Sequence, residues 1–248
     1  MNRSTASLDR GAHIEHTDLR AISFHHVRFP GLELVDVEIS GEIQDVTING
    51  VDIGPLIEAE LNRRLPDRVK LHPTTVVEFQ VGGAILERLW AETEDRARAL
   101  PPELLHERVR DEWSFIETLR HLGFASAAWV GRMVLGDPVP WHPLDLPWDE
   151  APGWDGIPWD RDARPSLDEV IAVRRKRRAM VRDVINGLTP EQLDSTVTQT
   201  APGWPQLEEF PLTQCLFIVV NEEWHHRLYA ERDLDALEAT AAATEGEN

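Results

Sequence analysis

The chain has 248 residues, 42% of them hydrophobic and 9 of them Trp, so it can bury a core of ordinary size. Its formal net charge of −19 disfavours binding to nucleic acid or to an anionic membrane, and no apolar run is long enough to span a bilayer. One Cys excludes an internal disulfide, and residues 1–10 lack the apolar part of a signal peptide, so we expect a cytoplasmic protein. Since the charge disfavours nucleic acid and membranes, the expected partner is a small molecule. We expect a monomer or a homodimer.

The first fifty-odd residues carry an unusual apolar rhythm. Residues 1–12 are polar and expected to be disordered, and residues 13–55 then repeat an apolar residue at every fifth position, as in Leu19, Phe24, Phe29, Leu34 and Ile39. A period of five fits neither a helix nor a simple strand. The segment resembles the pentapeptide-repeat family, which implies a β-coil with these side chains inside; a few ordinary strands are the alternative. Four histidines of this segment are expected on the surface: His13, His16, His25 and His26.

The rest of the chain predicts a bundle of helices. Residues 56–75 read as a short helix and a proline-framed linker, and residues 76–238 hold four long helical patterns. Three of these begin with a capping box, in which a hydroxyl caps the helix and a Glu three residues later reaches back: Thr75 and Glu78, Ser114 and Glu117, Ser166 and Glu169. The predicted spans of the first three are Val76–Ala99, Phe115–Leu135 and Leu167–Asn186, and the fourth has Pro211 near its first turn and continues to about Leu237.

These spans predict a mainly α protein, a four-helix bundle with a small N-terminal β segment. The core candidates of the first and third helices are Val81, Ile85, Leu89, Trp90, Val170, Ile171, Met180, Val181, Val184 and Ile185. Residues 239–248 are expected to be disordered. The basic run Arg174–Arg178 is predicted as a solvated helix face. The long loop 138–165 holds four Trp and either walls a substrate pocket or is a surface loop fixed by its aromatic rings.

Two polar residues interrupt the inward stripe of the fourth helix. Leu212, Leu216, Val219, Tyr229 and Ala230 form that stripe, and Glu222 and His226 lie within it, one turn apart. A carboxylate and an imidazole facing inward are costly unless a partner such as a metal ion binds them.

His121, in the second turn of the helix capped by Ser114, is the predicted third ligand, with its neighbours Glu117 and Arg120 facing outward. Two histidines and one carboxylate leave coordination positions open, as in catalytic sites. Zinc is the expected ion, and nickel, iron and manganese also suit these ligands.

Several nearby residues are assigned lesser roles. Glu223 and His225 are the reserve carboxylate and imidazole if a different face of the helix turns inward, and Tyr229 is a reserve contact for substrate. Cys215 lies on the buried stripe, where a free Cys is usually inert, so we do not assign it as a nucleophile.

Two motifs carry a family resemblance. Residues Trp113–Leu122 (WSFIETLRHL) and Glu222–Arg227 (EEWHHR) resemble the DinB/YfiT-like superfamily, in the branch of mycothiol-dependent maleylpyruvate isomerase. The resemblance covers residues 76–238. It implies an up-down-down-up four-helix bundle, a His-Glu-His metal site made by His121, Glu222 and His226, and chemistry with a low-molecular-weight thiol as co-substrate.

The sequence therefore predicts a metal-dependent enzyme, a thiol S-transferase or thiol-dependent isomerase acting on a small electrophile. The alternative is a non-catalytic metal-binding module for stress response or interaction, with the N-terminal segment as its interaction surface. A third hypothesis, hydrolysis by metal-bound hydroxide, requires a general base that the sequence does not identify.

Overall fold

The computed structural model describes residues 23–39, 43–154, 157–201 and 203–246, and it divides the chain into two compact units, Met1–Val46 and Thr47–Asn248. The expected disordered residues 1–12, together with His13, His16 and Leu19, lie outside the described residues.

The described part of the first unit does not show the coil that the five-residue rhythm predicts. Residues 23–39 and 43–46 contain neither helix nor strand. The apolar side chains that a coil would enclose are exposed instead, for example Phe24 at 59%, Leu34 at 50% and Ile39 at 71%. A repeat of five places apolar residues regularly along the chain, but it supplies no hydrogen-bonded neighbour for the backbone. His25 and His26 are exposed, as expected.

The second unit begins with a short hairpin. Strands β1 (Thr47–Ile48) and β2 (Val51–Asp52) pair antiparallel, with Ile48 opposite Val51. Asn49 and Gly50 form the turn with φ of 50° and 83°. Both angles lie in the left-handed region that a tight Asn-Gly hairpin turn requires.

The helices follow the predicted order. Their bounds are α1 Gly54–Arg64, the 3₁₀ helix η1 Pro66–Leu71, α2 Val76–Arg98, the 3₁₀ helix η2 Pro102–His106, α3 Phe115–Ser126, the π-helical segment η3 Ala127–Val134, α4 Leu167–Gly187, α5 Pro190–Leu193 and α6 Leu212–Gly246. All three predicted capping boxes form, at Ser114, Thr75 and Ser166. None of the helices among the described residues is long and apolar enough to cross a membrane.

Two helices differ from their predicted ends. The second predicted helix is α-helical only to Ser126 and then widens into the π-helical segment, where the Leu135 amide donates to the Val130 carbonyl. The prediction that residues 239–248 are disordered is wrong as far as Gly246, because α6 continues through them. Residues 239–245 contain no Pro or Gly and are mostly Ala, the strongest helix former.

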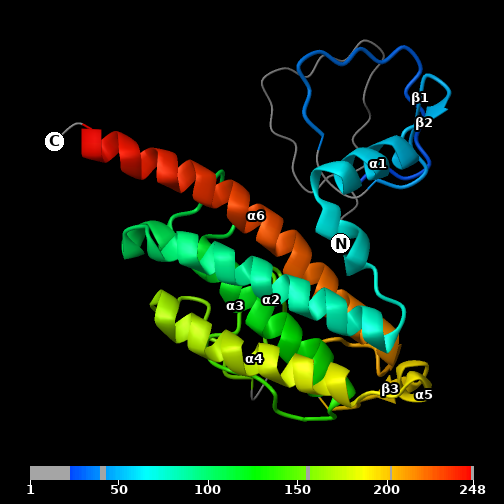
Figure 1. Cartoon of the computed structure of the whole chain (residues 1–248), viewed down its shortest axis with the longest axis vertical. Helices are drawn as coiled ribbons and strands as arrows, with labels where there is room; N and C mark the ends of the chain where they lie inside the picture. Colours follow the sequence, from blue (N-terminus) through cyan, green and yellow to red (C-terminus); the bar gives the residue numbers. More distant parts are fainter. Residues whose placement is uncertain (1–22, 40–42, 155–156, 202, 247–248) are drawn as a thin grey trace. The chain divides into compact units, whose positions relative to one another are not determined.

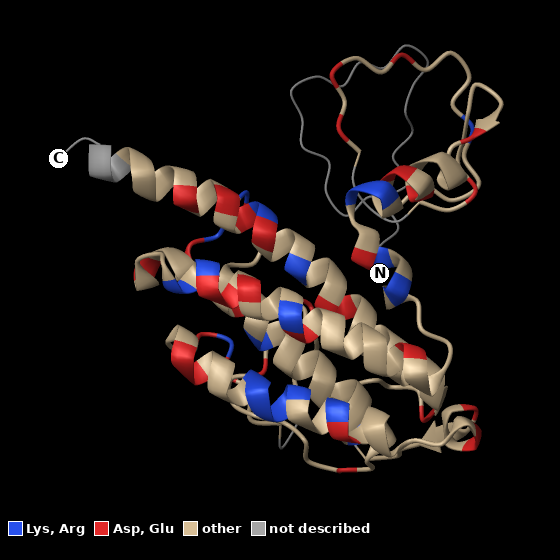
Figure 2. Cartoon of the chain, viewed as in Figure 1, with Lys and Arg blue, Asp and Glu red and all other residues tan. Residues whose placement is uncertain are grey.

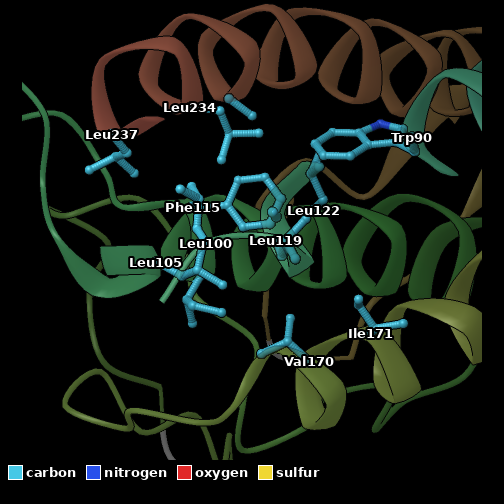
Figure 3. Packing of buried hydrophobic residues seen from close by; sticks show 13 residues of the cluster. Trp90, Leu100, Leu105, Phe115, Leu119, Leu122, Val170, Ile171, Leu234 and Leu237 are labelled. Carbon is cyan, nitrogen blue, oxygen red and sulfur yellow. The ribbon is translucent and has the colours of Figure 1, made fainter. Parts of the chain in front are cut away.

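The four long helices form the predicted bundle (Figure 1). α2 packs on α4 and α6, and α3 packs on the same two helices, so α2 and α3 are diagonal to each other. Figure 3 shows the core at one end, where α2, α3, α4 and α6 contribute Trp90, Leu119, Ile171 and Leu234, all buried. A second apolar cluster, with Phe79, Leu86, Ile185, Leu212, Leu216 and Val219, continues the core. A short antiparallel ladder, β3 (Thr196–Thr198) with β4 (Glu209–Pro211), leads into α6.

Two residues predicted to be inward are exposed. Val81 is 44% exposed and Tyr229 is 46% exposed. α2 buries the face that includes Phe79, and Val81 lies two residues further on, roughly 200° around the helix. Tyr229 is adjacent to the buried Ala230 but points away from the core.

The predicted outward position of Arg120 is wrong. Its side chain is buried, and its guanidinium donates hydrogen bonds to Leu144 O (2.9 Å), Ala163 O (2.8 Å) and Arg161 O (3.3 Å), and also to Asp160 O. These carbonyls belong to the loop 138–165, whose interior would otherwise leave them unpaired. The described part of the loop is therefore fixed in the unit, and its aromatic rings pack on α3, with Trp141 stacked on Phe124.

The predicted solvated face of α4 is only half correct. Arg175 and Lys176 are exposed, but Arg174 is buried against Glu223, Arg178 pairs with Glu94 of α2, and Arg177 pairs with the buried Asp145 of the loop. Figure 2 shows this basic segment of α4, and acidic segments on α2 and α6. Acidic residues of α2, α6 and the loop bind these arginines, and the sequence of α4 alone cannot reveal them.

Replacing Arg120 with Met should destabilise the unit by about 3 kcal/mol, because the carbonyls that it binds would lose charge-assisted hydrogen bonds inside the protein. Urea unfolding followed by circular dichroism measures the change. Arg175→Met, on the exposed face of α4, is the matched control and should stay within about 0.5 kcal/mol of the wild type. Equal stability of the two variants would contradict the role given to Arg120.

Candidate metal centre

His121 is held in one orientation by the loop that follows its helix. The capping box of Ser114 and Glu117 sets the start of α3 and places His121 in the second turn. Its Nδ1 lies 3.0 Å from the carbonyl oxygen of Leu146, to which it donates. This bond fixes the tautomer, so Nε2 carries a free lone pair directed away from the loop.

α6 supplies the other two candidate ligands, as predicted. Glu222 and His226 are four residues apart and share one face of the helix. The Nε2 atoms of both histidines converge on one oxygen of Glu222: His121 Nε2 lies 3.3 Å from Glu222 Oε2, and His226 Nε2 lies 3.1 Å from it. The three ligand atoms lie within 4.8 Å of one another.

These distances fit a divalent ion bound to all three side chains. Ligand atoms about 2.1 Å from one tetrahedral ion lie roughly 3.4 Å apart. The Nε2 atom of His226 is buried and makes no hydrogen bond with any described residue, although Glu222 is near it. A buried nitrogen of this kind requires a partner, and a metal ion would be one.

The electrostatics keep Glu222 ionised. Burial by itself favours the neutral acid, but the interaction with the adjacent imidazoles of His121 and His226 outweighs it and holds the pKa of Glu222 well below its ordinary value. A metal ligand must be deprotonated, so this environment prepares the carboxylate for binding.

The triad is reachable from solvent. The side chains of His121, Glu222 and His226 are 11%, 31% and 17% exposed. Trp113 lies beside them, its ring 4.6 Å from that of His121 and 6.0 Å from that of His226. Tyr229, the reserve substrate contact, is exposed with its ring 5.9 Å from that of His226. The rings of Trp113 and Tyr229 thus border candidate ligands whose side chains are partly exposed to solvent, as a substrate site requires.

A family model described as the DinB superfamily matches residues 85–230. That match covers more than half of the chain and includes His121, Glu222 and His226. The chain belongs to the DinB superfamily. No curated protein and no solved structure matches it.

The reserve ligands of this DinB-superfamily chain are not part of the triad. Glu223 turns into the core, where its carboxylate accepts hydrogen bonds from Arg174 at 2.9 and 3.3 Å. His225 is on the exposed side of α6, and partial desolvation of its ring together with the charge of Arg68 lowers its pKa. Cys215 is fully buried, which raises the pKa of its thiol to about 12 and agrees with its assignment as packing.

Sequence reasoning missed two contributors to this site. Trp113 immediately precedes the cap of α3 and opens the motif that carries the family resemblance, but nothing local places its ring beside the histidines. The carbonyl oxygen of Leu146 has no signal in the sequence, because any residue could supply a backbone oxygen and the loop fold alone brings it to His121.

Glu222 should make the stability of the metal-free protein depend on pH. Its folded-state pKa is depressed, so its stabilising contribution is complete above its ordinary value of 4.5 and is lost as pH falls below it. The stability difference between wild type and Glu222→Gln should therefore shrink as pH falls from about 6 to about 3. Urea midpoints measured with a chelator test this, and a difference that stays constant or grows would contradict it.

Proposed function

We propose that this DinB-superfamily chain is a metal-dependent enzyme that transfers a low-molecular-weight thiol to a small electrophile, or uses the thiol to assist an isomerisation. The observation that carries the proposal is the convergence of His121, Glu222 and His226, with one buried imidazole nitrogen unbonded and one carboxylate kept ionised. Membership of a superfamily whose members generally bind metal supports it.

In this proposal the three side chains bind the metal ion and leave one or more of its coordination positions open. Two imidazoles and one carboxylate suit zinc, and also nickel, iron or manganese. When bound, the ion would lower the pKa of a thiol so that the reactive thiolate is present at neutral pH.

The chain's own residues provide the rest of the site. The Leu146 carbonyl orients His121, and the rings of Trp113 and Tyr229 border the open side. In this proposal these rings bind the apolar part of the thiol or of the electrophile. Cys215 is excluded as the attacking group by its burial and by the raised pKa of its thiol, so the sulfur comes from a separate thiol.

Metal binding is the first test. Purified protein should hold about one divalent ion per chain, and alanine at His121, Glu222 or His226 should weaken binding by more than about a hundredfold, because each change removes a direct ligand. Elemental analysis and chelator competition measure this. His225→Ala is the matched control on the same helix and should bind as the wild type does. Wild-type protein without stoichiometric metal would refute the proposal.

Thiol chemistry is the second test. The metal-loaded protein should accelerate conjugation of chlorodinitrobenzene with one of mycothiol, bacillithiol or glutathione. A C–S bond forms, chloride leaves and the thiol proton goes to solvent. The rate should fall to background in His226→Ala and after chelation, while His225→Ala keeps the wild-type rate. Metal binding without acceleration by any thiol would favour the alternative below.

The alternative is a non-catalytic metal-binding module. One observation favours it: the described part of the first unit exposes a row of apolar side chains, including Phe24, Phe29, Leu32, Val37 and Ile39. Exposed apolar groups in such number are characteristic of an interaction surface.

On this alternative, removing residues 1–46 would abolish partner binding while the metal content stays unchanged.

A further inference from the structure

Glu222 and His226 bind one ion together with His121 only if α6 keeps one rotation about its axis. Successive residues in an α-helix are about 100° apart, so a small rotation would turn both ligands away from α3. A residue next to a ligand therefore controls the ligand's direction if its own side chain is fixed. Glu223 follows Glu222, and Arg227 follows His226.

Glu223 is fixed by two other helices. Arg174 of α4 donates to both of its carboxylate oxygens, at 2.9 and 3.3 Å, and the two side chains are only 1% and 8% exposed. Trp90 of α2 donates from its indole nitrogen to the backbone carbonyl of Glu223 at 3.2 Å. The guanidinium of Arg174 also lies over the Trp90 ring, 4.8 Å from its centre. Side chain and backbone of one residue are thus both held.

The next turn of α6 is anchored in a similar way. Arg227 donates from Nε to the Leu89 carbonyl at 3.1 Å and to the Thr93 hydroxyl at 2.9 Å, both on α2. Each of these two candidate ligands is therefore followed by a residue that is bonded to α2, or to both α2 and α4. The anchors hold the ligands toward α3 without touching the metal site.

We propose that Arg174, with Trp90, is a positioning residue: through Glu223 it fixes the rotation of α6 that directs Glu222 and His226 toward His121. This inference rests on the proposed metal site and assigns a role within it. A purely structural ion pair would stabilise the protein without changing metal affinity, so the two roles can be separated.

The test replaces the pair without leaving a buried charge. In Arg174→Met/Glu223→Met both charges disappear, and apolar side chains of similar length fill the space, so the variant should fold. Its zinc affinity, measured by chelator competition, should fall about tenfold or more, as for other changes behind a ligand. Its cobalt complex should also absorb differently in the visible range, because the ligand directions change. Thermal unfolding, monitored by circular dichroism, checks the fold.

Arg178→Met/Glu94→Met is the matched control. Arg178 lies one turn from Arg174 on α4 and pairs with Glu94 of α2, so the same kind of pair is removed without touching α6. This control should keep wild-type zinc affinity and cobalt spectrum. If the Arg174/Glu223 double variant fails to fold, Arg174→Lys retains the charge and should weaken zinc binding several-fold.

The outcomes separate the two claims. Wild-type protein that binds no zinc refutes the metal site itself. If the folded Arg174/Glu223 double variant keeps wild-type zinc affinity, the positioning role is refuted and the metal site stays intact. If the double variant does not fold, wild-type zinc affinity in Arg174→Lys refutes the role in the same way. An equal loss of zinc affinity in the Arg178/Glu94 control also refutes it, because the effect would then come from general loosening of the bundle.

Discussion

Arg174 and Glu223 form an ion pair enclosed by three helices, and the arrangement of α6 depends on it. A buried charge is tolerated only with a matched partner, so α6 can place only one of its two adjacent carboxylates toward Arg174. Glu223 takes that place. Glu222 is then turned toward α3, where the imidazoles of His121 and His226 keep it ionised. One pairing constraint in the core thus decides which carboxylate is available to a metal ion.

A similar constraint governs the long loop after α3. Its backbone carbonyls would be unpaired inside the unit, and Arg120 and His121, adjacent on α3, bind them on two sides. Arg120 fixes the loop, and the loop in return orients His121 through Leu146. The aromatic residues of the loop pack on Phe124 and cover the same side of α3. The loop therefore belongs to the candidate metal site although it contributes no candidate ligand.

The two halves of the site differ in how they are supported. α3 presents its ligand through a backbone carbonyl of a neighbouring loop, whereas α6 presents its ligands through side-chain ion pairs and hydrogen bonds to α2 and α4. The ligands remain partly exposed while their supports are buried. Rigid support beneath an accessible triad suits chemistry on a small molecule that enters from solvent.

The sequence by itself determined the helices of this DinB-superfamily protein and the three residues that the structure brings together, because capping boxes and the spacing of Glu222 and His226 are local patterns. It misassigned Arg120, Arg174 and Tyr229, since the burial of one side chain depends on what a distant helix or loop places against it. The apolar rhythm of the first unit predicted an enclosed coil and the structure shows exposed side chains. Only the tertiary structure assigned Glu223 to the core, and brought the Leu146 carbonyl to His121, because both result from pairing between segments far apart in the chain.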